Sequence, residues 1–274
     1  MPITPAPKKS LGQHWLHDDA TLEAICESAD VGEGDTVLEV GPGLGTLTRK
    51  LLARGAQITA VEFDHDLAVN LGKHLWEGSL PKAGEAERLV VVEQDILQFD
   101  LRQMPPGYKV VANIPYYLTS NLIRVLTESP SQFSIVAILI QKEVAERVAA
   151  NPGEMSILSV TAQFYCEATL GPFVPARLFT PPPKVDSQVL ILRYREKPLF
   201  ENVDPKLFFR LVKAGFSQKR KTLQNSLRGG LAITKPEAAQ LLESAGISPT
   251  ARAQELSLEE WHALYLAAQT GVRP

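Results

Sequence analysis

The tetrapeptide Asn113-Ile114-Pro115-Tyr116 combines residue types that can hold a flat ring carrying an amino group. The amine of such a ring is a poor nucleophile, because its lone pair is delocalised into the ring. If the side-chain oxygen of Asn113 and the carbonyl of Ile114 accept its two N–H bonds, the lone pair turns towards an electrophile. Pro115 fixes the turn and has no N–H to compete, and Tyr116 can stack on the ring. The motif therefore predicts a pocket in which a planar amine attacks an electrophile.

A glycine-rich turn offers a place for that electrophile. Gly41, Gly43 and Gly45 follow a short apolar segment that contains an acid, Glu39. A dinucleotide-binding turn has the pattern G-x-G-x-x-G, with its last glycine three residues after the second, and this turn has a different spacing. A carboxylate here would repel a pyrophosphate but would tolerate a cofactor that carries an amino acid and a sulfonium cation. The turn therefore favours a sulfonium cofactor over a dinucleotide.

Two further acids stand where later strands are expected to end. Glu62 is placed to accept hydrogen bonds from both hydroxyls of a ribose, and Phe63 follows it in the same site. Asp95 can accept a hydrogen bond from an adenine amino group while Ile96 packs on the ring. Acids in this order at successive strand ends resemble class I S-adenosylmethionine methyltransferases. We therefore expect S-adenosylmethionine as the cofactor, S-adenosylhomocysteine as the product, and no metal.

The elements that must position these residues alternate along the chain. Apolar segments alternate with segments of helical periodicity, which predicts a mainly parallel sheet with helices on both faces. The expected strands are 36–40, 57–61, 89–92, 109–112 and 133–140, and the expected helices are 46–52, 66–76, 120–127 and 142–149. Two more strand-like segments, 157–169 and 187–194, lack a long helix between them and predict an antiparallel edge. The predicted fold class is α/β, a Rossmann-like class I methyltransferase with a seven-stranded sheet.

Strand-like segments disappear after Pro205. Helical patterns predict a small helical domain over 205–215, 219–228, 235–245 and 257–269. We place the domain boundary near residue 197, between a catalytic domain (1–197, with a tail and cofactor lid at 1–20) and a helical domain (198–274). Residues 206–228 contain seven basic side chains and no acid, although the net charge is −3. This local patch favours a polyanion partner, and a solvated helix face is the alternative.

The composition describes an ordinary soluble protein. The chain has 274 residues, of which 45% are apolar, and its mean hydropathy is −0.04. The apolar run 135–140 is too short to span a bilayer, and residues 1–9 lack the hydrophobic core of a signal peptide. Cys26 and Cys166 lack the spacing of a metal or redox motif. We therefore expect a cytoplasmic protein that does not contact membranes.

An aromatic residue on a second face would help to hold the reacting ring. A base inside a nucleic-acid helix cannot reach such a pocket, so it must be flipped out or already unpaired. Phe179 begins the proline-rich segment 179–187 and is the candidate for this second face. By itself Phe179 would be assigned to the core.

Six segments together resemble the ribosomal RNA adenine N6-dimethyltransferases of the small subunit, over nearly the whole chain. They are residues 13–16, 39–48, 113–116, 141–147, 179–187 and 216–223. The resemblance implies that three residues near the N-terminus close over the cofactor, namely Gln13, His14 and Leu16. It implies that three residues at strand ends bind the methionine, ribose and adenine parts, in the order Gly41, Glu62 and Asp95. Asn113 would line both the cofactor and the substrate site.

The chain departs from the family pattern at two places. Trp15 stands where the family usually has phenylalanine, an aromatic change that would alter the packing of the lid. Residues 154–157 follow Pro152-Gly153 where the family commonly has a longer segment. The second departure concerns a loop expected to face RNA and leaves the chemistry unchanged.

The resemblance implies dimethylation of the N6 amines of two adjacent adenosines in the 3′-terminal hairpin of small-subunit (16S) ribosomal RNA. The substrate would be an assembling 30S particle, and the enzyme a monomer. The helical domain would hold RNA through its phosphates, using Lys213, Lys219, Arg220, Lys221 and Arg228. Specificity is expected to come from RNA shape, because little in the sequence is typical of base-edge recognition.

Three alternatives remain open. The antibiotic-resistance enzymes that methylate one adenine of large-subunit RNA share the Asn-Ile-Pro-Tyr and glycine motifs, but the run 181–187 and the longer C-terminal region favour the small-subunit enzymes. A non-catalytic ribosome assembly or RNA-binding factor could keep the same fold, and the intact Asn113, Tyr116 and Glu62 argue against it. A nicotinamide dehydrogenase is disfavoured by the glycine spacing.

Overall fold

The computed structural model describes residues 7–8, 11–76 and 80–271. The chain divides into two compact units, the first made of Met1–Ala145 with Glu167–Tyr194 and the second of Glu146–Cys166 with Arg195–Pro274. The expected division at residue 197 differs from this one, because Glu146–Cys166 belongs with the C-terminal helices. Most of the tail expected at residues 1–9 lies outside the described residues.

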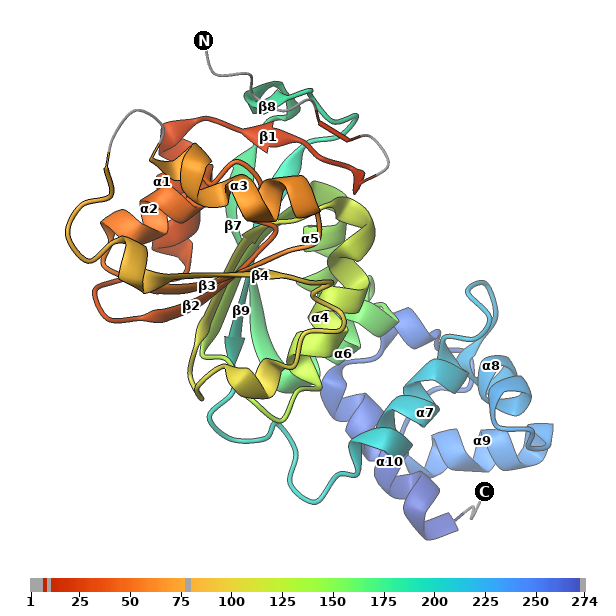
Figure 1. The fold of residues 1–274 in the computed structure, drawn as a ribbon. Helices are drawn as coiled ribbons and strands as arrows, with labels where there is room; N and C mark the ends of the chain where they lie inside the picture. The colour runs from red at the N-terminus through yellow and green to blue at the C-terminus, as the bar shows by residue number, and fades with distance from the viewer. Residues whose placement is uncertain (1–6, 9–10, 77–79, 272–274) are drawn as a thin grey trace. The chain divides into compact units, whose positions relative to one another are not determined.

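A seven-stranded sheet forms the centre of the first unit (Figure 1). The strand order is β4-β3-β2-β5-β6-β9-β7. The bounds are β2 (Thr36–Val40), β3 (Gln57–Glu62), β4 (Leu89–Glu93), β5 (Lys109–Asn113), β6 (Ile135–Gln141), β7 (Cys166–Val174) and β9 (Ser187–Tyr194). Neighbouring strands from β4 to β6 are parallel, and β9 is antiparallel to β6. The predicted α/β class, mainly parallel sheet and antiparallel edge are therefore confirmed.

The direction in which strands are added reverses between β2 and β5. From β2 the chain builds outward to β3 and β4, and then returns to place β5 and β6 on the other side. In open parallel sheets ligands bind beyond the carboxyl ends of the strands at such a reversal, where the loops diverge. The turn that begins at Gly41 and the motif that begins at Asn113 lie at these two strand ends. The topology therefore places the two predicted halves of the site next to each other.

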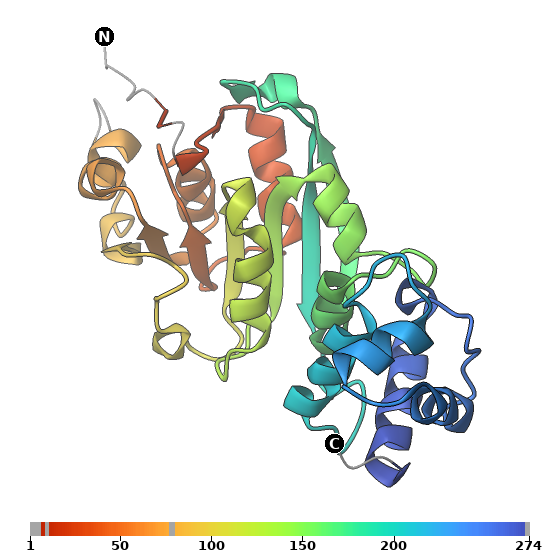
Figure 2. The same ribbon diagram turned by 90° about the vertical axis from the view of Figure 1, so that its right-hand side faces the viewer.

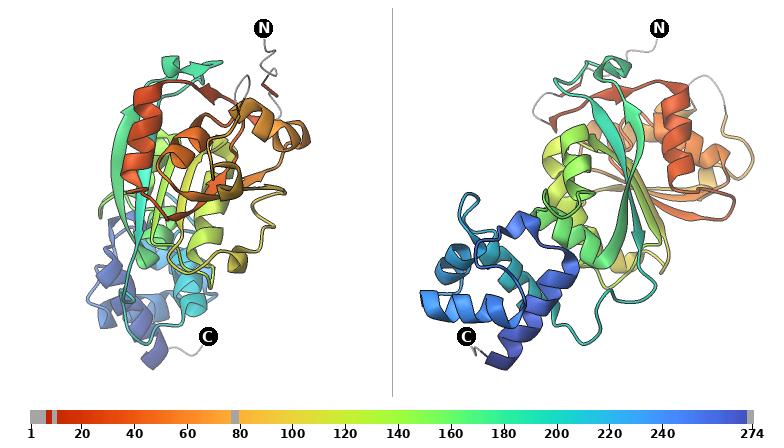
Figure 3. Two further views of the ribbon diagram at one scale, coloured as in Figure 1. Left: turned by 60° about the vertical axis from the view of Figure 1, so that its left-hand side comes forward. Right: turned by 180° about the vertical axis from the view of Figure 1, so that it is seen from behind.

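Helices cover both faces of the sheet, as the turned views show (Figures 2 and 3). On one face lie α1 (Asp19–Ser28), α2 (Thr46–Ala53) and α3 (His65–Leu75). Their buried Ile25, Leu51 and Leu71 share a core with Val111 and Ala137 of the sheet. On the other face lies α4 (Thr119–Thr127), and α5 (Lys142–Val148) follows β6. Because side chains alternate along a strand, the two faces of the sheet contribute to separate cores.

The segment 157–169, predicted as a strand, begins instead with the helix α6 (Ile157–Tyr165), and only then continues as β7. Ser156 caps this helix, since its side chain accepts from the backbone N–H of Ser159 while the Ser159 side chain bonds to the backbone N–H of Ser156. The buried Val160 and Phe164 are four residues apart, which is the spacing of a helix face. The prediction was wrong here because neighbouring apolar and β-branched residues obscure that period.

The second unit is helical. It contains α7 (Pro205–Gly215), α8 (Leu223–Gly230), α9 (Lys235–Ser244) and α10 (Leu258–Gly271), together with α6. The fully buried Trp261 belongs to its core. The short segment after Pro152 is anchored within the unit, because the backbone N–H of Gly153 donates to the carbonyl of Gln254 and the Gln254 carboxamide donates to the carbonyl of Gly153, both at 2.9 Å. Among the described residues, no helix combines the length and apolar character needed to cross a membrane.

Candidate active site

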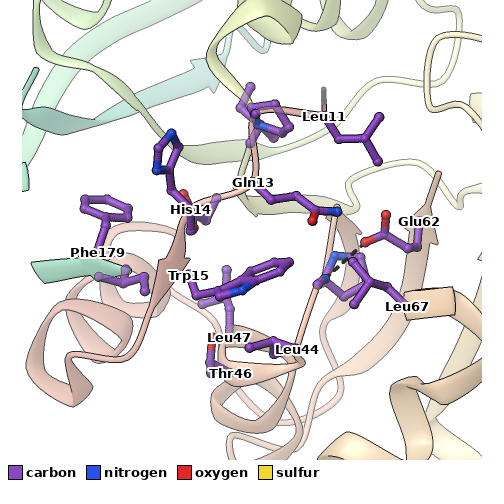
Figure 4. Close-up of a pocket in the computed structure, with 18 of the residues that line it drawn as sticks. Leu11, Gln13, His14, Trp15, Leu44, Thr46, Leu47, Glu62, Leu67 and Phe179 are labelled. Carbon is purple, nitrogen blue, oxygen red and sulfur yellow. Dashed lines mark hydrogen bonds between the residues drawn. The ribbon is translucent and has the colours of Figure 1, made fainter. Parts of the chain in front are cut away.

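A cavity lies at the carboxyl ends of β2, β3 and β5 (Figure 4). Its wall is formed by the N-terminal segment, the glycine turn, the end of β3 and the Asn113 motif. Every residue predicted to bind cofactor or to catalyse lines this cavity, except Gly45, Asp95 and Ile96. The fold therefore brings together groups that are more than 160 residues apart in the sequence.

At two glycines of the turn, neighbouring side chains leave no room for a Cβ atom. Gly43 has a φ of 56°, and a Cβ there would lie 2.8 Å from the ring of Trp15. Gly45 caps α2 with a φ of 76°, and a Cβ there would lie 2.7 Å from the side chain of Leu75. Other residues adopt such positive φ values only with strain. The spacing of the glycines thus lets the Trp15 ring lie on the turn and lets α3 pack against it.

Glu39 presents a buried carboxylate to the cavity. It is 1% exposed, and neither of its oxygens has a hydrogen-bond partner among the described residues. Burial raises the pKa of Glu39 to about 8. The hydroxyl of the neighbouring Thr48 counteracts part of this rise, although no hydrogen bond joins the two side chains. A buried carboxylate without a partner is costly, and a bound cation would compensate it. This site therefore fits the positively charged groups of S-adenosylmethionine, its α-ammonium and its sulfonium.

Glu62 is held by two backbone N–H groups, one in the glycine turn and one just after β3. Its Oε2 accepts from the N–H of Gly43 at 3.1 Å, the dashed line in Figure 4, and its Oε1 accepts from the N–H of Asp64 at 2.9 Å. The side chain is buried, and this burial raises its pKa. Each carboxylate oxygen can accept a second hydrogen bond. Glu62 is thus oriented to receive two further donors, as the hydroxyls of a ribose would provide.

Asp95 and Ile96 line an adjoining hollow, which shares Gly41, Glu62 and Phe63 with the cavity. Asp95 accepts from the backbone N–H of Leu97 at 3.0 Å through Oδ1, and Ile96 is 4% exposed. Phe63 is 62% exposed and offers an apolar ring at the junction. Two hollows with shared walls suit a cofactor made of an amino acid and a nucleoside.

Asn113 ends β5 and faces the N-terminal segment. Its Nδ2 donates to the carbonyl of His14 over a long 3.5 Å contact, which leaves the side-chain oxygen to accept from another group. The hydroxyl of Tyr116 is hydrogen-bonded to the Ser187 Oγ at 2.8 Å. Burial raises the pKa of Tyr116, which keeps it a neutral phenol. The carboxamide and the ring are therefore both held in place before a substrate binds.

Phe179 lies on a strand and not on the loop expected from its prolines. The two-stranded antiparallel sheet of β1 (Trp15–Leu16) and β8 (Phe179–Thr180) places it opposite Leu16. It is 3% exposed and belongs to the core, although it also reaches the cavity wall beside His14 (Figure 4). His14 Nδ1 donates to the carbonyl of Pro181 at 2.7 Å, because a carbonyl can only accept. The lid and the proline-rich segment thus hold each other in place.

Two groups that hold the N-terminal segment were missed from the sequence. The ammonium of Lys8 donates to Asp64 at 2.8 Å and to Asp66 at 2.9 Å, and the Gln13 carboxamide donates to Asp64 at 3.2 Å. These hydrogen bonds raise the pKa of Lys8. The sequence offered one signal for these contacts, because Asp64 is a second acid only two residues after Glu62. The indole of Trp15, considered only as a departure from the family, extends into the centre of the cavity (Figure 4).

The five predicted RNA-binding residues are exposed side chains of the second unit. Lys213 lies on α7 and Arg228 on α8, but the predicted helix 219–228 begins only at Leu223. The residues 219–221 form a turn, because Thr222 is extended with a ψ of 154° and the N–H of Lys221 donates to the carbonyl of Gln218 at 3.1 Å. None of the five has an acidic partner in the part of the chain that is described.

The sheet topology, the glycine turn and the acids at successive strand ends define a class I S-adenosylmethionine-dependent methyltransferase. The chain belongs to the ribosomal RNA adenine dimethylase family, whose model matches residues 6–270. The family expected from the motifs is confirmed. Within the described residues, no group of three or more His, Cys, Asp and Glu side chains could hold a metal ion.

Individual relatives match over most of their length. The chain is 40% identical over 259 residues to ribosomal RNA small subunit methyltransferase A of Dehalococcoides mccartyi, covering 94% of this chain and 87% of the relative. The protein of the same name from a Synechocystis species is 39% identical over 278 residues, covering 93% and 94%.

Two solved structures have the same fold. One is a dimethyladenosine transferase from Plasmodium falciparum, with a TM-score of 0.76, 27% identity and coverage of 93% of this chain and 98% of that one. The other is the 23S ribosomal RNA methyltransferase ErmE, with a TM-score of 0.73, 30% identity and coverage of 93% and 100%.

Proposed function

We propose that this protein dimethylates the N6 amines of two adjacent adenosines in the 3′-terminal hairpin of small-subunit ribosomal RNA. The observation that carries the proposal is the placement of the Asn113 carboxamide on the same cavity wall as Glu39 and Glu62. The name shared by the relatives at about 40% identity supports the choice of the small subunit. The substrate is an assembling 30S particle in the cytoplasm. In this proposal the enzyme acts as a monomer.

In this proposal the residues have separate tasks. Glu39 and the glycine turn bind the amino-acid end of S-adenosylmethionine, Glu62 the ribose, and Asp95 the adenine. The bound cofactor supplies an electrophilic methyl group. Asn113 and the carbonyl of Ile114 accept the two N–H bonds of the target amine, which orients its lone pair. The proton leaves after the transfer, so no general base is required. The pocket must also admit a monomethylated amine for the second transfer.

The substrate is tested directly by incubating the protein with labelled S-adenosylmethionine and unmethylated small subunits, and then mapping the modified nucleosides. We expect two neighbouring dimethyladenosines near the 3′ end. The likeness to ErmE makes a large-subunit adenine the second candidate, so large subunits and their free RNA are assayed in parallel. Methylation of those substrates with none on small subunits would contradict the proposal.

Replacing Lys219, Arg220 and Lys221 together with alanine should weaken binding to small subunits roughly 10- to 100-fold at moderate salt, because each lysine or arginine that contacts a phosphate releases counterions. The salt slope should fall by roughly two to three for the same reason. Binding is measured over a series of salt concentrations. A matched triple variant at three exposed lysines outside residues 206–228, Lys73, Lys82 and Lys197, should keep the slope. An unchanged slope in the first variant would show that the turn does not contact RNA.

A further inference from the structure

A further hollow adjoins the lid segment, and no residue of the glycine turn lines it. The proline run 181–183 forms part of its wall, together with Lys184, Tyr116 and Gln141. Its volume is about 480 Å³, which lies within the usual range of small-molecule sites. It shares residues 12–14 and Tyr116 with the active-site cavity, but Asn113, Glu39 and Glu62 do not line it. We call it the outer hollow.

The sheet register explains why Gln141 faces Tyr116. Asn113 is the partner of Leu139 on β6, and Gln141 follows two residues later on the same face of the strand. Gln141 is also the partner of Ser187 on β9, whose hydroxyl is bonded to Tyr116. Side chains of paired residues point to the same face of a sheet. The Gln141 carboxamide therefore lies on the Asn113 side of the sheet, one strand further from the cofactor.

Two polar side chains of the outer hollow, those of Gln141 and Lys184, are free to bind. The side chain of Gln141 is half-buried and has no hydrogen-bond partner among the described residues. Lys184 is exposed and has no acidic partner within the described part of the chain. The ring of His14 is fixed by its hydrogen bond to the carbonyl of Pro181. A carboxamide can pair with the edge of a base, a lysine binds phosphate, and aromatic and proline faces pack on a flat ring. These groups together suit a nucleotide.

We propose that the outer hollow receives the nucleotide next to the target adenosine, with Gln141 at the edge of its base and Lys184 at its phosphate. This inference rests on the proposed function. The target amine must reach Asn113, so the target itself occupies the inner cavity. A directly linked neighbour has to lie close by, and the outer hollow adjoins that cavity through Tyr116 and residues 12–14. The adjacent adenosine is thus bound while its neighbour is methylated.

The test combines enzyme variants with an altered RNA. Small subunits are reconstituted with ribosomal RNA in which one of the two adenosines is replaced by an abasic nucleotide, and dimethylation of the other is followed. On this substrate the kcat/KM of the unaltered enzyme should fall roughly 10- to 100-fold, because base–protein packing is lost. Gln141→Ala should lose a similar factor on intact subunits, with little further loss on the abasic substrate. Lys184→Ala should weaken both substrates equally.

Controls separate this inference from the proposed function. Gln57→Ala and Lys73→Ala alter exposed residues of the first unit that line neither the active-site cavity nor the outer hollow. These two variants should behave as the unaltered enzyme. All variants should bind S-adenosylhomocysteine normally, which shows that they are folded. If the losses from Gln141→Ala and from the abasic nucleotide multiply independently, or if Gln141→Ala has no effect, the outer hollow does not hold the neighbouring base. If the unaltered enzyme fails on intact subunits, the proposed function is wrong as well.

Discussion

Replacing Asn113 with alanine is expected to lower kcat by roughly 10²- to 10³-fold or more, the loss typical of removing one group that stabilises charge in a transition state. The side-chain oxygen is the acceptor that the Asn113 carboxamide offers to the target amine. Its Nδ2 is already directed to the carbonyl of His14. Without that oxygen the amine keeps its delocalised lone pair. Affinity for S-adenosylmethionine should stay nearly unchanged, because Glu39 and Glu62 supply the charged contacts.

The measurement is single-turnover methylation of small subunits, with cofactor binding by calorimetry alongside. Asn113→Asp keeps an acceptor oxygen and loses the donor to His14, so it should retain more activity than the alanine variant. Asn121→Ala removes an exposed asparagine of α4 and serves as the matched control, with full activity expected. Full activity of Asn113→Ala would contradict the proposed role of the motif.

The affinity for S-adenosylmethionine is expected to increase with pH up to about 8, the pKa to which burial raises the free Glu39 carboxyl. A bound cation favours the ionised carboxylate, so binding must release the proton that Glu39 holds at lower pH. Below that pKa the affinity should fall up to about tenfold per pH unit. Glu39→Gln should lose this dependence and should bind about 10- to 100-fold more weakly at pH 8.5, since a charged hydrogen bond is removed. Binding is measured by calorimetry between pH 6 and 9.

The amino group of the cofactor also titrates and contributes to the pH dependence of the affinity. The Glu39→Gln variant serves as the control, because its pH profile contains the contribution of that amino group but not that of Glu39. The difference between the two pH profiles then reports Glu39 alone. Identical profiles would mean that Glu39 does not contact the cation.

The same carboxyl should destabilise the free protein at neutral pH. The pKa of Glu39 rises from 4.5 to about 8 on folding, so the unfolded chain ionises first and the free energy of unfolding falls as pH rises between these values. At pH 7 this pKa difference lowers the free energy of unfolding by about 3 kcal/mol. Glu39→Gln should therefore raise the stability of the cofactor-free protein near pH 7, with a gain that shrinks towards pH 5. Urea unfolding at several pH values tests this.

Much of the site could be predicted from the sequence because chemistry in parallel α/β sheets concentrates at the carboxyl ends of strands. Apolar runs identify those ends, so the residues that follow them, such as Gly41, Glu62 and Asn113, can be recognised without coordinates. The spacing of the glycines separated a sulfonium cofactor from a dinucleotide for the same reason, since it depends only on local backbone geometry. The α/β class and the antiparallel edge follow from the alternation of apolar and helical segments, and the family follows from the resemblance of six segments.

Only the tertiary structure decided how distant segments meet. Pairing of β1 with β8 buries Phe179 against Leu16, and the Lys8–Asp64 ion pair holds the lid, because both contacts join segments with no local signal of their partner. Local period also failed at α6, because Ser159, Thr161 and Gln163 alternate with apolar residues as they would in a strand. Residues 219–221 were predicted to be helical but form a turn, because Thr222 is extended and the helix begins only at Leu223. The position of Gln141 beside Tyr116 depends on strand register, which side-chain alternation within one strand cannot specify.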